Sequence, residues 1–416
     1  MSKKRKAKKA KSTPPPKSKA PPPAKKIKWG AIALYVLGLF LFQEMVLRLC
    51  FPLPELSNFN RIKFQILEPA AGGPSYLRNR AMVWRSYPDT TADFVHQMNR
   101  YGYRDQDWSV SKPAGKKRIF FVGDSFVEGM MTTGDQTVPE HFKRAAGVAA
   151  GEYDIFNCGM MGIGLNEYTK FLAEAVPIFR PDVVFMVLYA NDIPFQKAYQ
   201  PPTSPEPTYF SFWRPRLLVL IDFIKAKDPI PFRWNNERIP FHQPVPDPGN
   251  PWSVKEAEWS PHVRPDLKEA MKQGTFNFFR LNWVLEEEKF LRQATDISTQ
   301  LQFLKQHLTK YGTELIVFYV PSRSQISNYY YTFERASCQQ NCPDQLDLTG
   351  PAYQVHRSLL SQQCSSLGFP FYDLTEPVKA EEDRGNHLYW DYDDHMRAKG
   401  YKVLGEAIWE RWRARQ

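Results

Sequence analysis

Apolar and polar positions along residues 113–416 follow two alternating periods. Short runs that are apolar on both faces are typical of strands in a sheet that is covered on each side, and segments with helical spacing separate them. This βα alternation predicts an α/β domain with a central parallel sheet between two layers of helices. The predicted strands are residues 119–122, 153–157, 183–189, 315–320 and 369–372, and the predicted helices are residues 138–149, 167–179, 282–310 and 401–412.

The alternation is interrupted by a segment rich in proline and aromatic residues. Residues 201–265 contain fourteen prolines, with tryptophans and phenylalanines between them. Proline removes a backbone donor and fixes φ, so this composition does not fit a series of regular elements. We predict an insertion at about residues 196–281 that packs over the edge of the sheet, its aromatic side chains forming a small core in preference to a sugar-stacking platform.

The N-terminal 50 residues have two parts of opposite character. Residues 1–28 hold twelve of the 55 basic residues and no acid, which leaves 43 basic and 44 acidic residues in the rest of the chain. This tail lacks apolar periodicity and contains two proline triplets, so we expect it to be disordered. Residues 29–50 contain only Glu44 and Arg48 as charges, four positions apart near one end. They are predicted to form a transmembrane helix.

A buried helix or a cleaved signal peptide is the alternative interpretation of residues 29–50. No A-x-A cleavage site follows the run, and residues 47–50 lack the small residue expected before a lipidated cysteine. Because the positive charges precede the helix, the tail is predicted to be cytoplasmic. The chain is then a single-pass protein of the inner membrane with a periplasmic domain. Residues 51–112 form its stem, within which 99–105 (NRYGYRD) has the pattern of a β-turn or strand end.

The cysteines fit an oxidising compartment. Cys338 and Cys342 are close enough in sequence to form a disulfide, whereas Cys158 and Cys364 lie in apolar or helical surroundings typical of core packing. A zinc pair is the rival interpretation of Cys338 and Cys342. Since no second Cys or His pair at ligand spacing lies nearby, we expect no metal site.

Polar residues follow three predicted strands at their carboxyl ends, where open parallel sheets bind ligands. Ser125 follows the first strand, Gly162 and Gly164 follow the second in NCGMMGIG, and Asn191 follows the third in YANDI. His395 lies in WDYDDHMRAKGY, just before the last helix. Read singly, the serine fits a helix cap and the glycines fit turns. Together they supply a nucleophile, oxyanion donors and a base.

These four blocks, in this order, resemble those of the SGNH hydrolases, also called the GDSL family. The resemblance covers roughly residues 99–195 and 282–416 and implies a three-layer α/β/α flavodoxin-like fold without a cofactor. By position it implies that Ser125 is the nucleophile and His395 the base. The backbone N–H groups of Ser125 and Gly162 and the carboxamide of Asn191 are then the oxyanion hole.

Two positions depart from the family pattern. The usual Asp-x-x-His spacing would place the acid at position 392, which is a tyrosine. Asp393 gives Asp-x-His, a spacing associated with membrane-anchored members that act on polysaccharides, and Asp391 and then Asp394 are the alternatives. In the third block the usual Gly-x-Asn-Asp begins with Tyr189 in place of glycine, so the pocket width is expected to differ.

The sequence therefore predicts a membrane-anchored serine esterase or O-acyltransferase that acts on acyl groups, chiefly acetyl, of a cell-envelope glycan through an acyl-serine. By resemblance, a multispanning membrane acyltransferase is an expected partner. A catalytically inactive glycan-binding or scaffold subunit of an envelope complex is the alternative. The basic tail also suits a nucleic-acid arm, but attraction to anionic lipid explains the same charges, so no nucleic-acid partner is expected.

Overall fold

The computed structural model describes residues 29–50, 81–84, 92, 94–99, 101–193, 215–225, 238–240, 269, 295–335, 344–391 and 393–416. The predicted disordered tail, most of the predicted insertion and the Cys338–Cys342 pair lie outside these residues, so those expectations stay predictions. The chain divides into two compact units, Met1–Val46 and Leu47–Gln416.

The described strands are β1 (Ala81–Trp84), β2 (Phe94–Gln97), β3 (Lys117–Gly123), β4 (Tyr153–Gly159), β5 (Val183–Tyr189), β6 (Arg238–Pro240), β7 (Glu314–Val320) and β8 (Phe371–Asp373). The described helices are α1 (Trp29–Cys50), α3 (Ser125–Glu128), α4 (Val138–Ala146), α5 (Leu165–Phe179), α6 (Arg216–Lys225), α10 (Ser298–Tyr311), α11 (Arg323–Ile326), α12 (Asn328–Arg335), α13 (Val355–Leu367), α14 (Thr375–Glu382) and α15 (Ala398–Arg413).

Helix α1 has the length and composition of a membrane span. Its 22 residues have a mean hydropathy of 1.9 over the most apolar window, and none of them is buried. At about 1.5 Å per residue the helix is roughly 33 Å long, close to the hydrocarbon thickness of a bilayer. A signal sequence near an N-terminus shares these properties.

Five parallel strands form the central sheet in the order β4-β3-β5-β7-β8. In chain order of these five strands this is 2-1-3-4-5, the flavodoxin-like order. The parallel sheet predicted from the apolar runs is therefore confirmed. The register pairs Gly123 with Gly159 and Val122 with Met186, so the strands end at one common edge.

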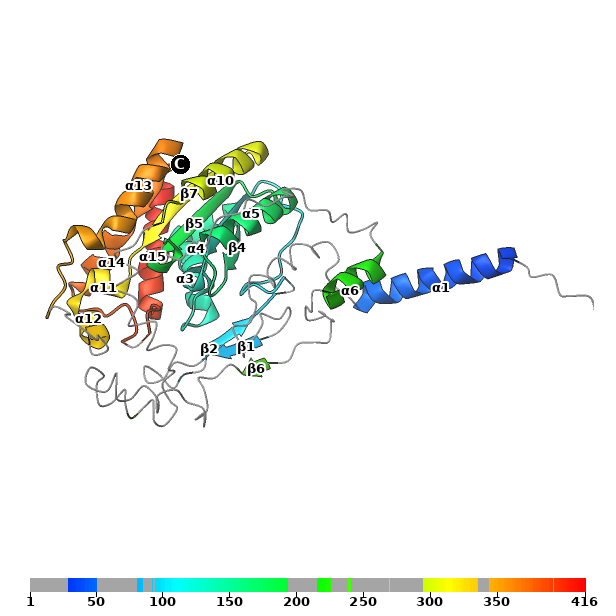
Figure 1. The fold of residues 1–416 in the computed structure, drawn as a ribbon, viewed down its shortest axis with the longest axis horizontal. Helices are drawn as coiled ribbons and strands as arrows, with labels where there is room; N and C mark the ends of the chain where they lie inside the picture. The colour runs from blue at the N-terminus through cyan, green and yellow to red at the C-terminus, as the bar shows by residue number, and fades with distance from the viewer. Residues whose placement is uncertain are drawn as a thin grey trace, which may run out of the picture. The chain divides into compact units, whose positions relative to one another are not determined.

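Helices cover both faces of this sheet, as Figure 1 shows. Along β3 the side chains alternate: Phe120 and Val122 belong to a core with α5, α10 and α13, whereas Ile119 and Phe121 belong to a core with α4, α12, α14 and α15. A strand covered on both sides must be apolar on both sides, which is why β3 and β5 read as continuous apolar runs. The result is a three-layer α/β/α architecture.

Several element boundaries differ from the predicted ones. Helix α4 ends at Ala146, and residues 147–152 continue as a 3-10 helix, because Gly147 takes a φ of 58° that an α-helix cannot accommodate. The helix predicted over 282–310 is described only from Ser298, as α10. Helices α13 and α14 were not predicted. Cys158 and Cys364 are buried, in agreement with the expected core packing.

A second, small sheet contains β2, β1 and β6, with β2 antiparallel and β6 parallel to β1. The predicted turn at 99–105 follows β2. The Asn99 side-chain oxygen accepts hydrogen bonds from the N–H groups of Tyr101 (2.9 Å) and Tyr103 (3.0 Å), and Gly102 between them has a φ of 78°. The turn is confirmed, and it leads the chain from the small sheet toward the central one.

This turn ends at a carboxyl group with a strongly altered acidity. Asp105 accepts hydrogen bonds from the Trp108 indole and from the Asn157 N–H, both at 2.8 Å. Burial outweighs these bonds and raises the pKa of Asp105 to about 6. Because the pKa is higher in the folded chain, folding favours the protonated form. The stability that this provides is present below the unfolded pKa of 3.8 and is lost as pH rises through about 6.

We therefore expect Asp105→Asn to become more stable relative to the wild type as pH rises. A pKa difference of about 2 corresponds to roughly 3 kcal/mol, and residual solvent contact reduces this to about 2 kcal/mol. Denaturant unfolding of both chains in detergent micelles at about pH 3.5 and 7.5 measures the change. A pH-independent difference between the two chains would show that Asp105 titrates normally.

Candidate active site

Ser125 is the first residue of α3, directly beyond the carboxyl end of β3. Asp124 caps this short helix, because its Oδ1 accepts a hydrogen bond from the Phe126 N–H at 2.9 Å. The Gly-Asp-Ser turn therefore is a helix cap and also places the serine at the sheet edge. The N–H of a first-turn residue has no acceptor inside its helix, so the Ser125 N–H is available to a ligand.

The Ser125 side chain is buried, with 5% of its surface exposed, and its hydroxyl donates to Asp124 Oδ2 at 3.4 Å. That distance is long for an O–H···O hydrogen bond, whose usual length is about 2.7–2.8 Å. The hydroxyl is therefore held only weakly in this direction.

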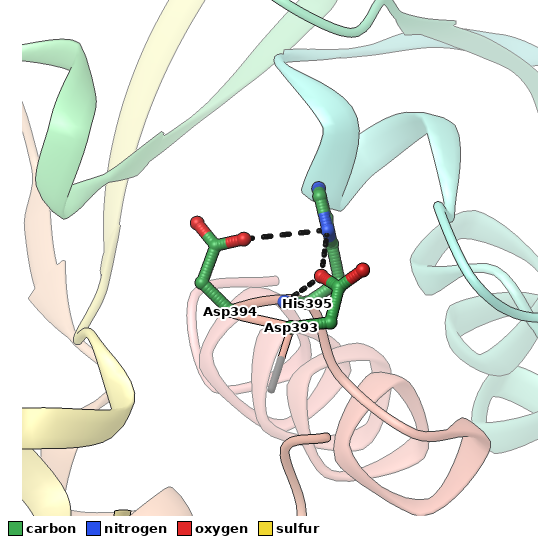
Figure 2. Close-up of side chains that lie close together, drawn as sticks. All are labelled: Asp393, Asp394 and His395. Carbon is green, nitrogen blue, oxygen red and sulfur yellow. Dashed lines mark hydrogen bonds and ion pairs between the residues drawn. The ribbon is translucent and has the colours of Figure 1, made fainter. Parts of the chain in front are cut away.

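His395 and Asp393 form the strongest polar pair of the site. Nδ1 of His395 lies 2.5 Å from Asp393 Oδ1, which also accepts the His395 backbone N–H at 3.0 Å. Asp394 Oδ1 is farther from the same nitrogen, at 3.5 Å. Figure 2 shows both carboxylates beside the same ring nitrogen, with the second ring nitrogen pointing away from them. An ionised carboxylate only accepts, so Nδ1 carries the proton and Nε2 is left basic.

Asp391, an alternative acid in the sequence, has different partners. Its Oδ1 accepts hydrogen bonds from the Tyr329 hydroxyl (3.1 Å) and from Nη2 of Arg397 (3.0 Å). The guanidinium of Arg397 also lies over the Trp390 ring, 4.8 Å from its centroid. Asp391 therefore belongs to a network that shapes the loop, while Asp393 contacts the imidazole.

Arg323, which the sequence analysis did not identify, holds the loop that carries Asp391 and Asp393. It is fully buried in α11, and its Nη1 donates to the carbonyls of Trp390 (3.0 Å), Asp391 (2.7 Å) and Asp393 (3.4 Å). A buried guanidinium needs acceptors for its N–H groups, and three loop carbonyls supply them to Nη1. A lone arginine after a strand gives no sequence signal for such a role, because its acceptors are backbone atoms almost 70 residues away.

Phe126 is the point at which the separate loops meet the serine turn. Its ring stacks on Tyr189, at the end of β5, with 3.9 Å between ring centroids, and it lies 5.5 Å from the His395 ring. On the β4 side, the Met160 N–H donates to Gly123 O at 3.1 Å. The end of β5, the loop after β4 and the loop before α15 therefore all contact the serine turn or the strand end that precedes it.

The two glycines of the second block have different surroundings. Gly164 caps α5, and its N–H donates to the Glu167 carboxylate at 3.2 Å. Gly162 is exposed, with a φ of 75° and open space where a Cβ would lie. Gly164 thus serves the helix, whereas Gly162 lies exposed on the loop after β4.

Asn191 follows β5 in a short 3-10 turn, and its side chain is partly exposed. Within the described part of the chain its carboxamide makes no hydrogen bond. An amide donor without an acceptor among the described residues is suited to a ligand oxygen. We expect Asn191→Ala to lower kcat for a simple acetyl ester about 10²- to 10³-fold, the usual cost of one oxyanion donor. Steady-state kinetics measure this loss, and an unchanged kcat would remove Asn191 from the site.

Asp192, its neighbour, is a buried acid with a structural role. It accepts hydrogen bonds from the Tyr168 hydroxyl (2.9 Å) and the Tyr189 N–H (2.8 Å), which ties the end of β5 to α5. Burial, and then the nearby charge of Asp124, raise the pKa of Asp192 well above its usual range. Burial likewise raises the pKa of Asp124, and the charge of His395 partly opposes this rise.

The carboxylates and imidazole at 393–395 also have the composition of a metal site. One ligand atom from each of Asp393, Asp394 and His395 lies within 4.8 Å of the others. Two ligands of one zinc ion, each about 2.0–2.2 Å from it, are separated by more than about 3 Å in a tetrahedral site. The 2.5 Å between Nδ1 and Asp393 Oδ1 is too short for shared coordination, so this pair is a hydrogen bond.

No protein-family model matches the sequence, and no curated protein sequence matches it. Among solved structures the chain is similar to the lipase/acylhydrolase from Enterococcus faecalis, with 14% identity over 72% of this chain and 96% of that one, at a TM-score of 0.35. An acetyl xylan esterase, AlAXEase, is 11% identical over 71% of this chain and 98% of its own, with a TM-score of 0.34. TesA is 9% identical over 71% and 97%, also with a TM-score of 0.34. At these identities and TM-scores the similarities do not bear on individual residues or substrates.

Proposed function

We propose that this chain is an SGNH-type serine esterase or O-acyltransferase in which Ser125 carries the acyl group. The observation that carries the proposal is the 2.5 Å hydrogen bond between His395 Nδ1 and Asp393 Oδ1, on a ring that packs 5.5 Å from Phe126, the neighbour of Ser125. This bond holds the imidazole with Nε2 basic and its ring beside the serine turn.

In the first half-reaction the Ser125 hydroxyl rotates from Asp124 toward His395. Its oxygen attacks the ester carbonyl carbon while its proton passes to Nε2 of His395. The Asp393 carboxylate stabilises the imidazolium that results. The negative charge that develops on the carbonyl oxygen is met by the N–H groups of Ser125 and Gly162 and the Asn191 carboxamide. The tetrahedral intermediate then expels the alcohol, which takes the proton from His395, and acyl-Ser125 remains.

In the second half-reaction an oxygen nucleophile attacks acyl-Ser125. Nε2 of His395 removes its proton, the oxyanion forms again in the same place, and Ser125 leaves with the proton returned to it. Water as nucleophile gives a free carboxylic acid, and a sugar hydroxyl gives a transferred acyl ester. The same residues perform both outcomes, so the access of water decides between them.

The substrate class and the location form the finer part of the proposal. The resemblance of the four sequence blocks to the SGNH hydrolases, with the Asp-x-His spacing at Asp393, favours acetyl groups of a cell-envelope glycan. Helix α1 and the twelve basic residues that precede it favour a single inner-membrane anchor with the catalytic domain in the periplasm. A multispanning membrane acyltransferase would supply the acyl groups.

The proposal is tested by following the fate of the acyl group. The full chain in detergent micelles is incubated with p-nitrophenyl acetate, with and without an unacetylated oligosaccharide, and acetate and acetylated sugar are quantified. We expect p-nitrophenol release in both reactions, with acetyl appearing on water or on sugar. Release no faster than in buffer alone, with a correctly folded chain, would support the inactive scaffold subunit instead.

A further inference from the structure

A buried carboxylate lies behind the serine turn. Glu128, the last residue of α3, has no exposed surface. Its Oε1 lies 2.7 Å from Nδ1 of His96 on β2, and its Oε2 accepts the Met161 N–H, also at 2.7 Å. One side chain therefore joins the serine turn, the loop after β4 and a strand of the small sheet.

His96 is the donor in its pair with Glu128. Burial, and then the positive charge of Arg104, lower the pKa of His96 to about 4, so its imidazole is neutral near pH 7. A neutral imidazole has one N–H, and a carboxylate only accepts. Nδ1 of His96 therefore carries the proton, and both oxygens of Glu128 are occupied as acceptors.

Arg104 also links strand β2 to the residues that follow α3. Its guanidinium donates to the carbonyls of Gly129, Thr132 (2.8 Å) and Val95 (3.1 Å). Val95 and His96 are consecutive residues of β2, so this strand is bound to the serine turn at two successive positions. The connection is polar and buried, where hydrogen bonds are electrostatically strong.

The chain at the end of β4 and in the loop after it contacts α3 as far as Met161, whereas space is free beside Gly162. A Cβ on Gly159 would lie 2.1 Å from the Glu128 nitrogen, so the end of β4 touches α3, whereas a Cβ on Gly162 would meet nothing. Each planar peptide leaves two soft dihedrals per residue. With the Met161 N–H fixed by Glu128, only φ and ψ of Met161 remain to orient the Gly162 N–H.

We propose, in an inference that rests on the proposed function, that Glu128 is a positioning residue that holds the Gly162 N–H toward the oxyanion. Through its bond with His96, strand β2 then becomes part of the catalytic apparatus although it lies outside the central sheet. Removal of the carboxylate releases the loop at Met161. Because the oxyanion exists only in the transition state, kcat should fall more than substrate binding weakens.

The test compares Glu128→Ala and Glu128→Gln with the wild type, as full chains in detergent micelles, on phenyl acetate and its thiono analogue. For Glu128→Ala we expect kcat to fall on the order of 10²-fold with KM within about threefold, as for loss of an oxyanion donor. The carboxamide of Glu128→Gln still accepts the Met161 N–H and should keep kcat within about tenfold of the wild type. Sulfur accepts hydrogen bonds weakly, so the preference for the oxygen ester should shrink in Glu128→Ala.

Glu140→Gln is the matched control, because Glu140 pairs with Lys143 on a partly exposed helix face. This variant should leave kcat and the preference for the oxygen ester unchanged. Suppose that Ser125 of the wild-type chain reacts with a fluorophosphonate. If Glu128→Ala then keeps the wild-type kcat and the wild-type preference for the oxygen ester, this inference alone is overturned. A wild-type Ser125 that does not react overturns the proposed function. If Glu128→Ala does not fold, the oxygen preference of His96→Ala, which removes the donor to Glu128 Oε1, decides: a reduced preference supports the inference, and a wild-type value contradicts it.

Discussion

Ser125→Ala should reduce ester turnover to little more than the background rate, a fall in kcat on the order of 10⁵-fold. The reason is that, in the proposed mechanism, the covalent acyl intermediate forms on this hydroxyl. The alanine retains the backbone N–H and the capped turn around Asp124, whose bond to the Phe126 N–H does not involve the serine side chain. We therefore expect unchanged folding and unchanged binding of a product glycan, measured beside p-nitrophenol release.

A matched control is Ser366→Ala. Ser366 is an exposed serine whose hydroxyl donates to Gln363 O at 2.8 Å, remote in role from the site. Its replacement should leave kcat within about twofold of the wild type, as for surface substitutions in general. Equal turnover by Ser125→Ala and Ser366→Ala would mean that the activity does not use Ser125.

Asp393→Asn should lower kcat about 10⁴-fold, because an asparagine amide facing Nδ1 favours the wrong tautomer and leaves the imidazolium uncompensated. The side chain keeps its size, so the packing of the loop is retained. Steady-state kinetics from about pH 6 to 9 measure the effect, with circular dichroism to verify the fold.

Asp391→Asn is the comparison that separates the two acids. Asp391 accepts from Tyr329 and Arg397 and does not contact the imidazole, so we expect its asparagine variant to retain kcat within about tenfold while losing some thermal stability. If Asp391→Asn proved as inactive as Asp393→Asn, the acid of the site would be misassigned, or the loop would depend on both.

The sheet and the location of the serine were accessible from the sequence for a physical reason. Strands β3 and β5 are buried on both faces, so nearly all of their residues must be apolar, and each strand is a continuous apolar run in the sequence. Because parallel strands end at one edge, the residues that follow them, Ser125, Gly162 and Asn191, are expected in neighbouring loops from the strand pattern alone. The approach of His395 to Phe126, the neighbour of Ser125, required the resemblance to a family as well.

Other features were not accessible, because their partners are distant or are backbone atoms. Arg323 acts through carbonyl oxygens of the loop at 390–393, and Glu128 acts through the Met161 N–H and His96, so no residue pairing in the sequence marks either role. The choice between Asp391, Asp393 and Asp394 likewise depended on loop conformation. The distances to Nδ1, 2.5 Å for Asp393 and 3.5 Å for Asp394, and the bond from the His395 N–H to Asp393 separate the last two.

Mass spectrometry of the full chain after reaction with a fluorophosphonate tests the central claim most directly, that an imidazole at His395 activates the hydroxyl of Ser125. The account predicts one adduct per chain, mapped to the peptide that contains Ser125, and a rate of labelling at least about 10²-fold lower in His395→Ala, on the order expected for loss of a general base. An adduct on another residue, or equal labelling of Ser125 in the two chains, would contradict it.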